Sequence, residues 1–177
     1  MAHPVVLVKY DPRWLAVYQE EKELILEAVG EKALAIEHIG STAVLGLGSK
    51  PIVDIMLGVL EPVDAEESLP RLREIGYDDV TPQPGNPDWY YCLGTHAHAN
   101  HDVYLHLHIV RFESDHWANH LLFRDYLQIH PEAAKQYSEL KSQLAVRYGN
   151  DRQAYTDGKK TFVDSVVTLA RQKHAVS

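Results

Sequence analysis

Hydrophobic and polar positions follow two different periods along this chain, and the change of period divides it near residue 112. In the first part, short apolar runs bounded by turn residues predict strands. These runs span residues 5–8, 34–39, 51–60, 77–81, 89–93 and 102–110. The run over 51–60 is nearly all apolar, so we expect it in the centre of a sheet. Helical spacing predicts helices over residues 11–30 and 64–75, and a glycine, Gly30 or Gly76, ends each of them.

The second part of the chain carries only helical spacing. Ser114 is a favourable N-cap, Pro131 restarts a helix, and Gly149 with Asn150 breaks it. The expected helices span residues 114–130, 131–148 and 151–172. The pattern therefore predicts a single α/β unit over residues 1–177, with a mixed α/β half over 1–112 and a helical half over 113–177.

Composition and charge narrow the classes of function. The chain has 177 residues, of which 45% are hydrophobic and 24% charged, which is enough for one domain with a core. No stretch approaches the roughly 18 apolar residues of a membrane span, and the start of the chain has no signal-peptide pattern. The single Cys92 excludes an internal disulfide framework. We therefore expect a cytoplasmic protein with no membrane partner.

The net charge of −8 makes long nucleic acid a poor partner, although a local basic pocket could still bind one nucleotide. Histidine is abundant, with 11 residues, and five of them fall between His96 and His108. Such clustering is typical of a metal site. His96, His98 and His101 are more simply read as part of a polar hairpin loop.

The segment from His38 to Asp54 carries the most specific chemistry. A strand runs into Gly40-Ser41, a glycine-rich loop follows, and a second apolar strand carries Asp54. Backbone N–H groups of a Gly-Ser turn can hold phosphate, and a nearby carboxylate can hold a divalent metal. This order of parts is typical of a nucleotidyltransferase site. The segment around Lys50 does not match the P-loop pattern, which argues against a P-loop kinase.

Asp54 lies within an otherwise apolar strand, where a charge is costly unless it is paired or binds metal. An ion pair with an arginine or a helix cap is the structural alternative to a ligand role. Met56 shares the face of Asp54, at the position where nucleotidyltransferases normally have a second carboxylate.

His106 and His108 lie two residues apart on one strand, so both imidazoles are predicted on one face. With Asp54 they would form a facial arrangement of two imidazoles and one carboxylate, suited to Mn²⁺, Zn²⁺ or Fe²⁺ better than to Mg²⁺. The same residues could serve as acid and base, or the two histidines could be hydrogen-bonded within a polar groove.

Several blocks of the sequence are similar to those of the GrpB family of nucleotidyltransferase-like proteins. The blocks are His38 to Leu47, Lys50 to Asp54, His106 to His108, Phe123 to Leu127, and Ala154 to Thr156 followed by Lys159. They occur in the family's order and cover nearly the whole chain. Leu45 stands where the family usually has proline, and Gln128 stands where arginine is common.

The resemblance implies a polymerase-β-like nucleotidyltransferase fold, with a mixed sheet and a C-terminal helical bundle. It supports a nucleotide and phosphate site, for which our candidates are Gly40, Ser41, Thr42, Lys50, Arg124, Tyr155 and Lys159. The corresponding catalytic and metal candidates are Asp54, His106 and His108. A nucleoside triphosphate is the expected substrate, together with Mg²⁺, Mn²⁺ or Zn²⁺.

The function expected from these residues is metal-dependent transfer of a nucleotidyl group to a small molecule or protein. Metal-dependent hydrolysis of a phosphoester or nucleotide is one alternative. Another is a non-catalytic module that binds a nucleotide or a coenzyme A precursor, because the family is sometimes fused to a dephospho-coenzyme A kinase. The sequence leaves the acceptor, the nucleotide, the metal and the formation of a homo-oligomer open.

Overall fold

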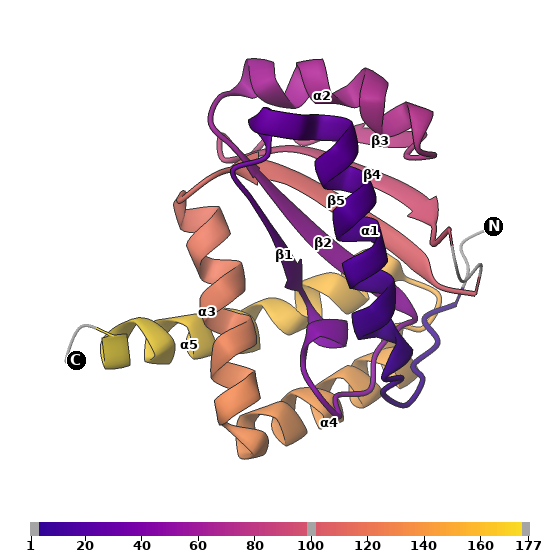
Figure 1. Ribbon diagram of the computed structural model, residues 1–177. Coiled ribbons are helices and arrows are strands. Elements are labelled where there is room, and N and C mark those ends of the chain that lie inside the picture. Colours follow the sequence, from indigo (N-terminus) through magenta and orange to yellow (C-terminus); the bar gives the residue numbers. More distant parts are fainter. Residues whose placement is uncertain (1–3, 99–101, 175–177) are drawn as a thin grey trace.

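The protein forms one five-stranded mixed sheet with helices on both faces (Figure 1). The computed structural model describes residues 4–98 and 102–174. The strands are β1 (Ala35–Ile39), β2 (Ile52–Val59), β3 (Asp79–Pro82), β4 (Trp89–His96) and β5 (Tyr104–Arg111). The helices are α1 (Arg13–Val29), α2 (Pro62–Glu74), α3 (Asp115–Ile129), α4 (Pro131–Tyr148) and α5 (Arg152–His174), with short 3₁₀ turns η1 (Gly30–Lys32) and η2 (Ser41–Ala43).

The strand order is β1-β2-β5-β4-β3, and only the β2–β5 pair is parallel. The predicted strand over 51–60 is an interior strand, but β5 occupies the middle of the sheet. In the parallel register Asp54 lies opposite His106 and Met56 lies opposite His108. Strands distant in sequence thus bring the predicted chemical residues together.

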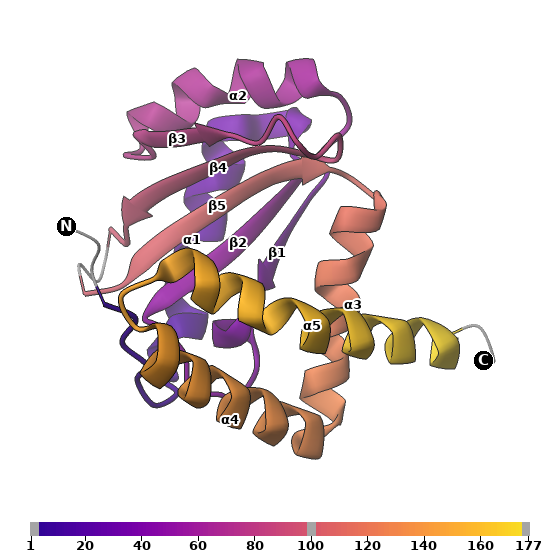
Figure 2. The same cartoon turned by 180° about the vertical axis from the view of Figure 1, so that it is seen from behind.

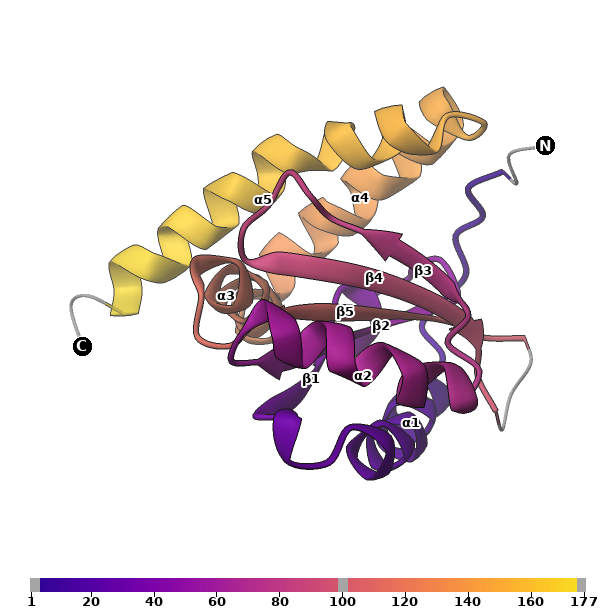
Figure 3. The ribbon, with the colours of Figure 1, turned by 90° about the horizontal axis from the view of Figure 1, so that it is seen from above.

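One face of the sheet is covered by α1 and α2 and forms the main apolar core, as seen from above in Figure 3. Alternate residues of β2 and β5 point into this core. They are Val53, Ile55, Leu57, Leu105, Leu107 and Ile109, and all are fully buried. Burial of whole aliphatic side chains supplies the main stabilisation of such a layer.

The opposite face of the sheet carries α3, α4 and α5 (Figures 1 and 2). Trp117 on α3 packs on Met56 and Val110, which seals one end of the face. Phe123 and Tyr137 belong to a separate cluster that joins the three helices to one another. This second layer is therefore held to the sheet mainly at one end, which leaves room for polar groups elsewhere.

The strand predicted over residues 5–8 is wrong. Val5 donates its N–H to Gly149 between α4 and α5, and Val8 forms only an isolated antiparallel bridge with Ser49. The segment therefore pairs with two loops rather than with an edge of the sheet. Among the described helices, none combines the length and the apolarity needed to cross a membrane.

Candidate active site

The glycine-rich turn after β1 packs directly on Asp54. Gly40 has a φ of 72°, a conformation that favours glycine, and η2 follows immediately. A Cβ atom at position 40 would lie 2.7 Å from Oδ2 of Asp54. A side chain at this position would therefore push the turn away from the carboxylate.

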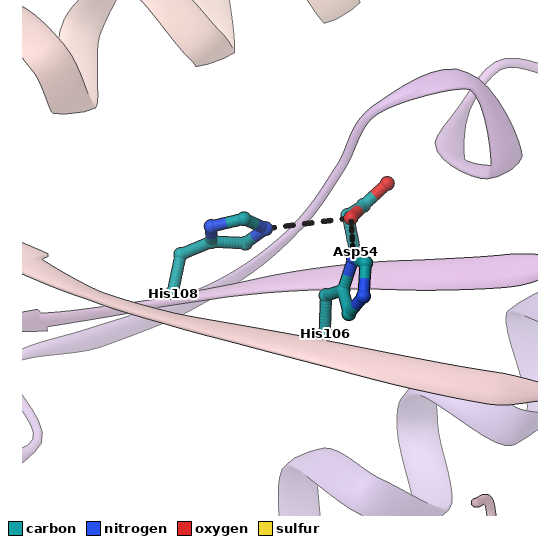
Figure 4. Close-up of side chains that lie close together, drawn as sticks. All are labelled: Asp54, His106 and His108. Carbon is teal, nitrogen blue, oxygen red and sulfur yellow. Dashed lines mark hydrogen bonds and ion pairs between the residues drawn. The ribbon is translucent and has the colours of Figure 1, made fainter. Parts of the chain in front are cut away.

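Asp54, His106 and His108 form the centre of the site (Figure 4). The β2–β5 pairing places Asp54 beside His106, and the two-residue period of a strand puts His108 on the same face. Nδ1 of His106 and Nε2 of His108 each lie 3.3 Å from Oδ1 of Asp54. One ligand atom from each residue lies within 4.8 Å of the others. This spacing suits one metal ion held by a carboxylate and two imidazoles.

The charges at this centre depend on one another. Burial disfavours ionised Asp54, but hydrogen bonds from His106 and His108 outweigh burial and hold its pKa well below the usual range. Burial also opposes a charge on His108, yet hydrogen bonds with Asp54 and Cys92 raise its pKa to about 9. In the metal-free protein His108 is therefore protonated at pH 7, and a metal ion would displace that proton.

Two lysines beside this centre share one aromatic ring. Lys50 lies just before β2, and Lys159 lies on α5; their Nζ atoms are 5.7 and 4.8 Å from the centroid of Tyr155. In the described parts of the chain, neither lysine forms an ion pair with a carboxylate. Burial lowers the pKa of both, that of Lys159 to about 8. Half-buried cations without such partners can attract an anion. Tyr155 is only 1% exposed, so it supports the lysines and cannot offer its face to a nucleobase.

A third lysine, Lys141 on α4, lies buried behind the glycine-rich loop. Its Nζ donates to Oγ of Ser41 at 3.0 Å and to the carbonyl of Gly48 at 2.5 Å. Burial, together with the charges of Lys159 and Lys50, lowers its pKa to about 7. Lys141 thus fixes both ends of the loop to α4 and adds to the positive potential of the site.

Two hollows border these groups. The larger, of about 550 Å³, is lined by Lys50, His106 and Arg152 among other residues. The second, of about 480 Å³, is lined by Gly40 and Lys159 and by residues of α3 and α5. Each hollow contains a lysine, and each reaches the triad or the turn packed on it. The two hollows thus offer room for one chemical group on each side of the charged centre.

Two of the predicted phosphate residues have other partners. Thr42 is buried, and its hydroxyl lies 3.0 Å from Nε2 of His38. Arg124 donates to Glu37 at 2.6 Å, to Asp125 at 2.7 Å and to the carbonyl of His38. The guanidinium is thus engaged in a network between α3 and β1. These contacts give no support to a phosphate-binding role for either residue.

The other clustered histidines, which the sequence analysis assigned to a polar hairpin loop, lie apart from one another where the structure describes them. His98 lies 2.9 Å from a carboxylate oxygen of the buried Glu21, which joins the β4 end to α1. His96 lines the larger hollow. His101 lies outside the described residues.

The sequence analysis missed three residues around the site. Lys141 resembled an ordinary surface lysine on an amphipathic helix, and no local signal indicates its burial. His116 and His120 lie in a segment whose N-cap and apolar stripe indicate only a packed helix. Their i, i+4 spacing, which places two imidazoles on one helix face, was the available signal.

Comparisons with known proteins agree with the architecture around this site. A sequence profile described as GrpB protein matches residues 4–168. The chain belongs to the GrpB family. The glutamate-rich protein GrpB of Alkalihalophilus pseudofirmus is 35% identical over 164 residues, which cover 92% of this chain and 94% of that protein. The crystal structure of GrpB from Enterococcus faecalis matches with a TM-score of 0.83 at 29% identity, covering 96% of this chain and 99% of that chain.

More distant structures show the same fold in nucleotidyltransferases. Terminal uridylyl transferase 4 from Trypanosoma brucei, solved with bound CTP, aligns with a TM-score of 0.51 at 17% identity. The alignment covers 92% of this chain and 51% of that chain. The GLD-2/RNP-8 complex aligns with a TM-score of 0.57 at 15% identity, over 90% of this chain and 58% of the other. This GrpB protein therefore has a nucleotidyltransferase-like fold.

A GrpB-like segment also occurs within longer proteins. The dephospho-CoA kinase of Mycolicibacterium paratuberculosis is 29% identical over 177 residues, which cover 89% of this chain and 44% of that protein.

Proposed function

We propose that this GrpB protein is a metal-dependent nucleotidyltransferase that acts on a small molecule or a protein hydroxyl. The observation that carries the proposal is the position of Lys50 and Lys159, which have no carboxylate partner among the described residues, beside Asp54, His106 and His108. An anion site next to a metal-ligand set, on a nucleotidyltransferase-like sheet, is what the transfer of a nucleotidyl group requires.

The donor set fits a divalent metal. One carboxylate oxygen and two imidazole nitrogens suit Mn²⁺, Zn²⁺ or Fe²⁺, and Gly40 keeps the second oxygen of Asp54 free of a side chain. Bound there, such an ion would polarise a phosphoryl oxygen and offset the charge that develops during transfer.

The lysines would bind the phosphates of the nucleotide. Lys50 and Lys159 lose part of their solvation by burial, as their lowered pKa values show, and a polyphosphate would restore favourable charge pairing. Lys141 would keep the turn at Ser41 in place, so that its backbone N–H groups face the phosphates.

The reaction would follow from this placement. An acceptor hydroxyl would attack the α-phosphorus and lose its proton to solvent, while a new oxygen–phosphorus bond forms and the bond to pyrophosphate breaks in line with it. Lys50 and Lys159 bind the departing pyrophosphate and stabilise its charge. The net charge of −8 disfavours a long nucleic-acid acceptor, which leaves a small molecule or protein.

Hydrolysis is a second candidate, and Met56 is the observation that favours it. This residue occupies the place of a second carboxylate on the site face, and it is fully buried against Trp117. A centre with one carboxylate and two imidazoles suits one metal ion better than the two that nucleotidyl transfer normally uses. Such a centre can activate water for attack on a phosphoester.

One assay distinguishes these outcomes. The purified protein would be incubated with each α-³²P-labelled nucleoside triphosphate, Mn²⁺ or Zn²⁺, and a mixture of nucleosides, sugars and hydroxyl-containing peptides. Label on an acceptor together with free pyrophosphate is the expected result, and it should disappear in Asp54→Asn but persist in Asp78→Asn, an exposed aspartate outside the site. Labelled monophosphate alone would establish hydrolysis instead. Binding without turnover would leave a module for nucleotides or coenzyme A precursors.

A further inference from the structure

His116, at the start of α3, carries a buried polar atom that nothing in the described chain satisfies. Its Nε2 has no hydrogen-bond partner among the described residues and is shielded from solvent. Buried polar groups in proteins are almost always hydrogen-bonded, so an exception calls for an explanation.

The hydrogen bonds of Asn86 fix which nitrogen of His116 carries the proton. Oδ1 of Asn86 accepts from the backbone N–H of Asp88 at 3.0 Å, so the amide group has one orientation. Its Nδ2 therefore donates to Nδ1 of His116 at 3.2 Å. Burial, with the nearby His108, lowers the pKa of His116, so the neutral ring has its single proton on Nε2.

That tautomer decides what the atom can bind. A protonated Nε2 cannot ligate a metal, because ligation requires the lone pair, but it can donate a hydrogen bond to an oxygen. Trp89 holds the ring in place by stacking on it, with centroids 5.3 Å apart and an interplanar angle of 21°. His116 is thus a fixed donor rather than an additional metal ligand.

The position of His116 places this donor beside the anion site. It lines the hollow of about 480 Å³ together with Gly40 and Lys159. The ring of His120 lies edge to face with it, at a centroid distance of 4.7 Å, and His120 makes no hydrogen bond within the described residues. A ligand oxygen reaches the shielded Nε2 of His116 only when a neighbouring side chain moves, and His120 is one of the side chains packed against this ring.

We propose that His116 Nε2–H donates a hydrogen bond to a phosphoryl oxygen of the ligand bound between the sheet and α5. The assignment rests on the proposed function, because it takes the lysine site to hold phosphates. A phosphoryl oxygen fits better than a neutral acceptor, since Lys159 has no carboxylate partner among the described residues. The carboxylates that also line this hollow have other partners, because Asp164 pairs with Lys160 and Asp157 accepts from Gln153. The ligand would satisfy a donor that the protein alone leaves unsatisfied.

Binding of Mn²⁺–pyrophosphate, measured by calorimetry, tests the assignment. His116→Phe keeps an aromatic ring for stacking on Trp89 but removes the donor, and it should weaken binding about tenfold or more. His116→Gln restores a donor near the position of Nε2 and should stay within about threefold of the wild type. His130→Phe, at the far end of α3, is the matched control and should leave the affinity unchanged.

The nitrogen resonances of ¹⁵N-histidine-labelled wild-type protein give a readout independent of any substitution. The Nε2–H tautomer of His116 should be visible before ligand is added, and its proton resonance should move downfield with pyrophosphate and Zn²⁺, which is diamagnetic. If the wild type binds pyrophosphate without a shift of this resonance, and His116→Phe binds equally well, the role of His116 is overturned and the proposed function stands. No binding of pyrophosphate to the wild type would overturn both.

Discussion

The two faces of the sheet use the same strands for opposite purposes. Toward α1 and α2, β2 and β5 present Ile55 and Leu107, which are fully buried among apolar neighbours. Toward α3 and α5 they present Asp54, His106 and His108. Both imidazoles contact the same carboxylate oxygen of Asp54, and all three side chains remain partly open to solvent. Alternate residues of one strand thus serve stability and chemistry in turn.

This difference predicts which property of the protein a substitution on each face should change. The apolar face gains from burial, whereas the polar face gathers charges that cost free energy until a ligand compensates them. Lys141 is the clearest case, because it is 2% exposed and its described contacts include no carboxylate. A substitution on the apolar face should therefore leave ligand binding largely intact, and a substitution on the polar face should leave the stability of the apolar core largely intact.

The largest effect is expected at the centre of the polar face. Asp54→Asn removes the charge shared by two imidazoles, and it should weaken the binding of Mn²⁺ or Zn²⁺ about a hundredfold or more. Metal content after loading and dialysis measures the loss, with Asp78→Asn as control. Stoichiometric metal in Asp54→Asn would show that the ion binds elsewhere.

The matching change on the apolar face is Leu107→Ala. The loss of a fully buried side chain should lower the free energy of unfolding by about 2–5 kcal/mol, as measured with urea. Metal affinity under native conditions should remain within about threefold of the wild type. A loss below about 1 kcal/mol would mean that this face is not the main core.

The buried position of Lys141 predicts that the free energy of unfolding depends on pH. Its pKa in the folded protein, about 7, is below the 10.5 of the unfolded chain, so the unfolded state binds more protons between these values. The free energy of unfolding should therefore rise from pH 7 toward 10.5, by roughly 2–4 kcal/mol from this group. Urea titrations of wild type and Lys141→Met at several pH values measure the difference, and equal slopes would refute it.

A smaller effect is expected for Lys159, which would contribute one of several phosphate contacts. Lys159→Met should weaken nucleotide binding about tenfold and leave metal binding unchanged. Lys135→Met, an exposed lysine on α4, is the control. Equal affinity in both variants would exclude Lys159 from the anion site.

The sequence predicted the alternation of β2 and β5, and hence that His106 and His108 share a face. It could not predict the parallel register that sets Asp54 opposite His106, because pairing between distant strands leaves no local pattern. It also could not show that Lys141 is buried or that Arg124 is engaged by Glu37, since both depend on how α3 and α4 pack against the sheet. The strand predicted over 5–8 has the right composition but no neighbouring edge to pair with.

The most direct test of the account is a calorimetric titration of the wild-type protein and Asp54→Asn with each nucleoside triphosphate, with and without Mn²⁺. The account predicts saturable binding to the wild type that is strengthened by Mn²⁺, and loss of that strengthening in Asp54→Asn, because the ion would join Asp54 to the phosphates. The same affinity with and without Mn²⁺, or no affinity at all, would contradict a metal-dependent nucleotide site on the polar face of the sheet.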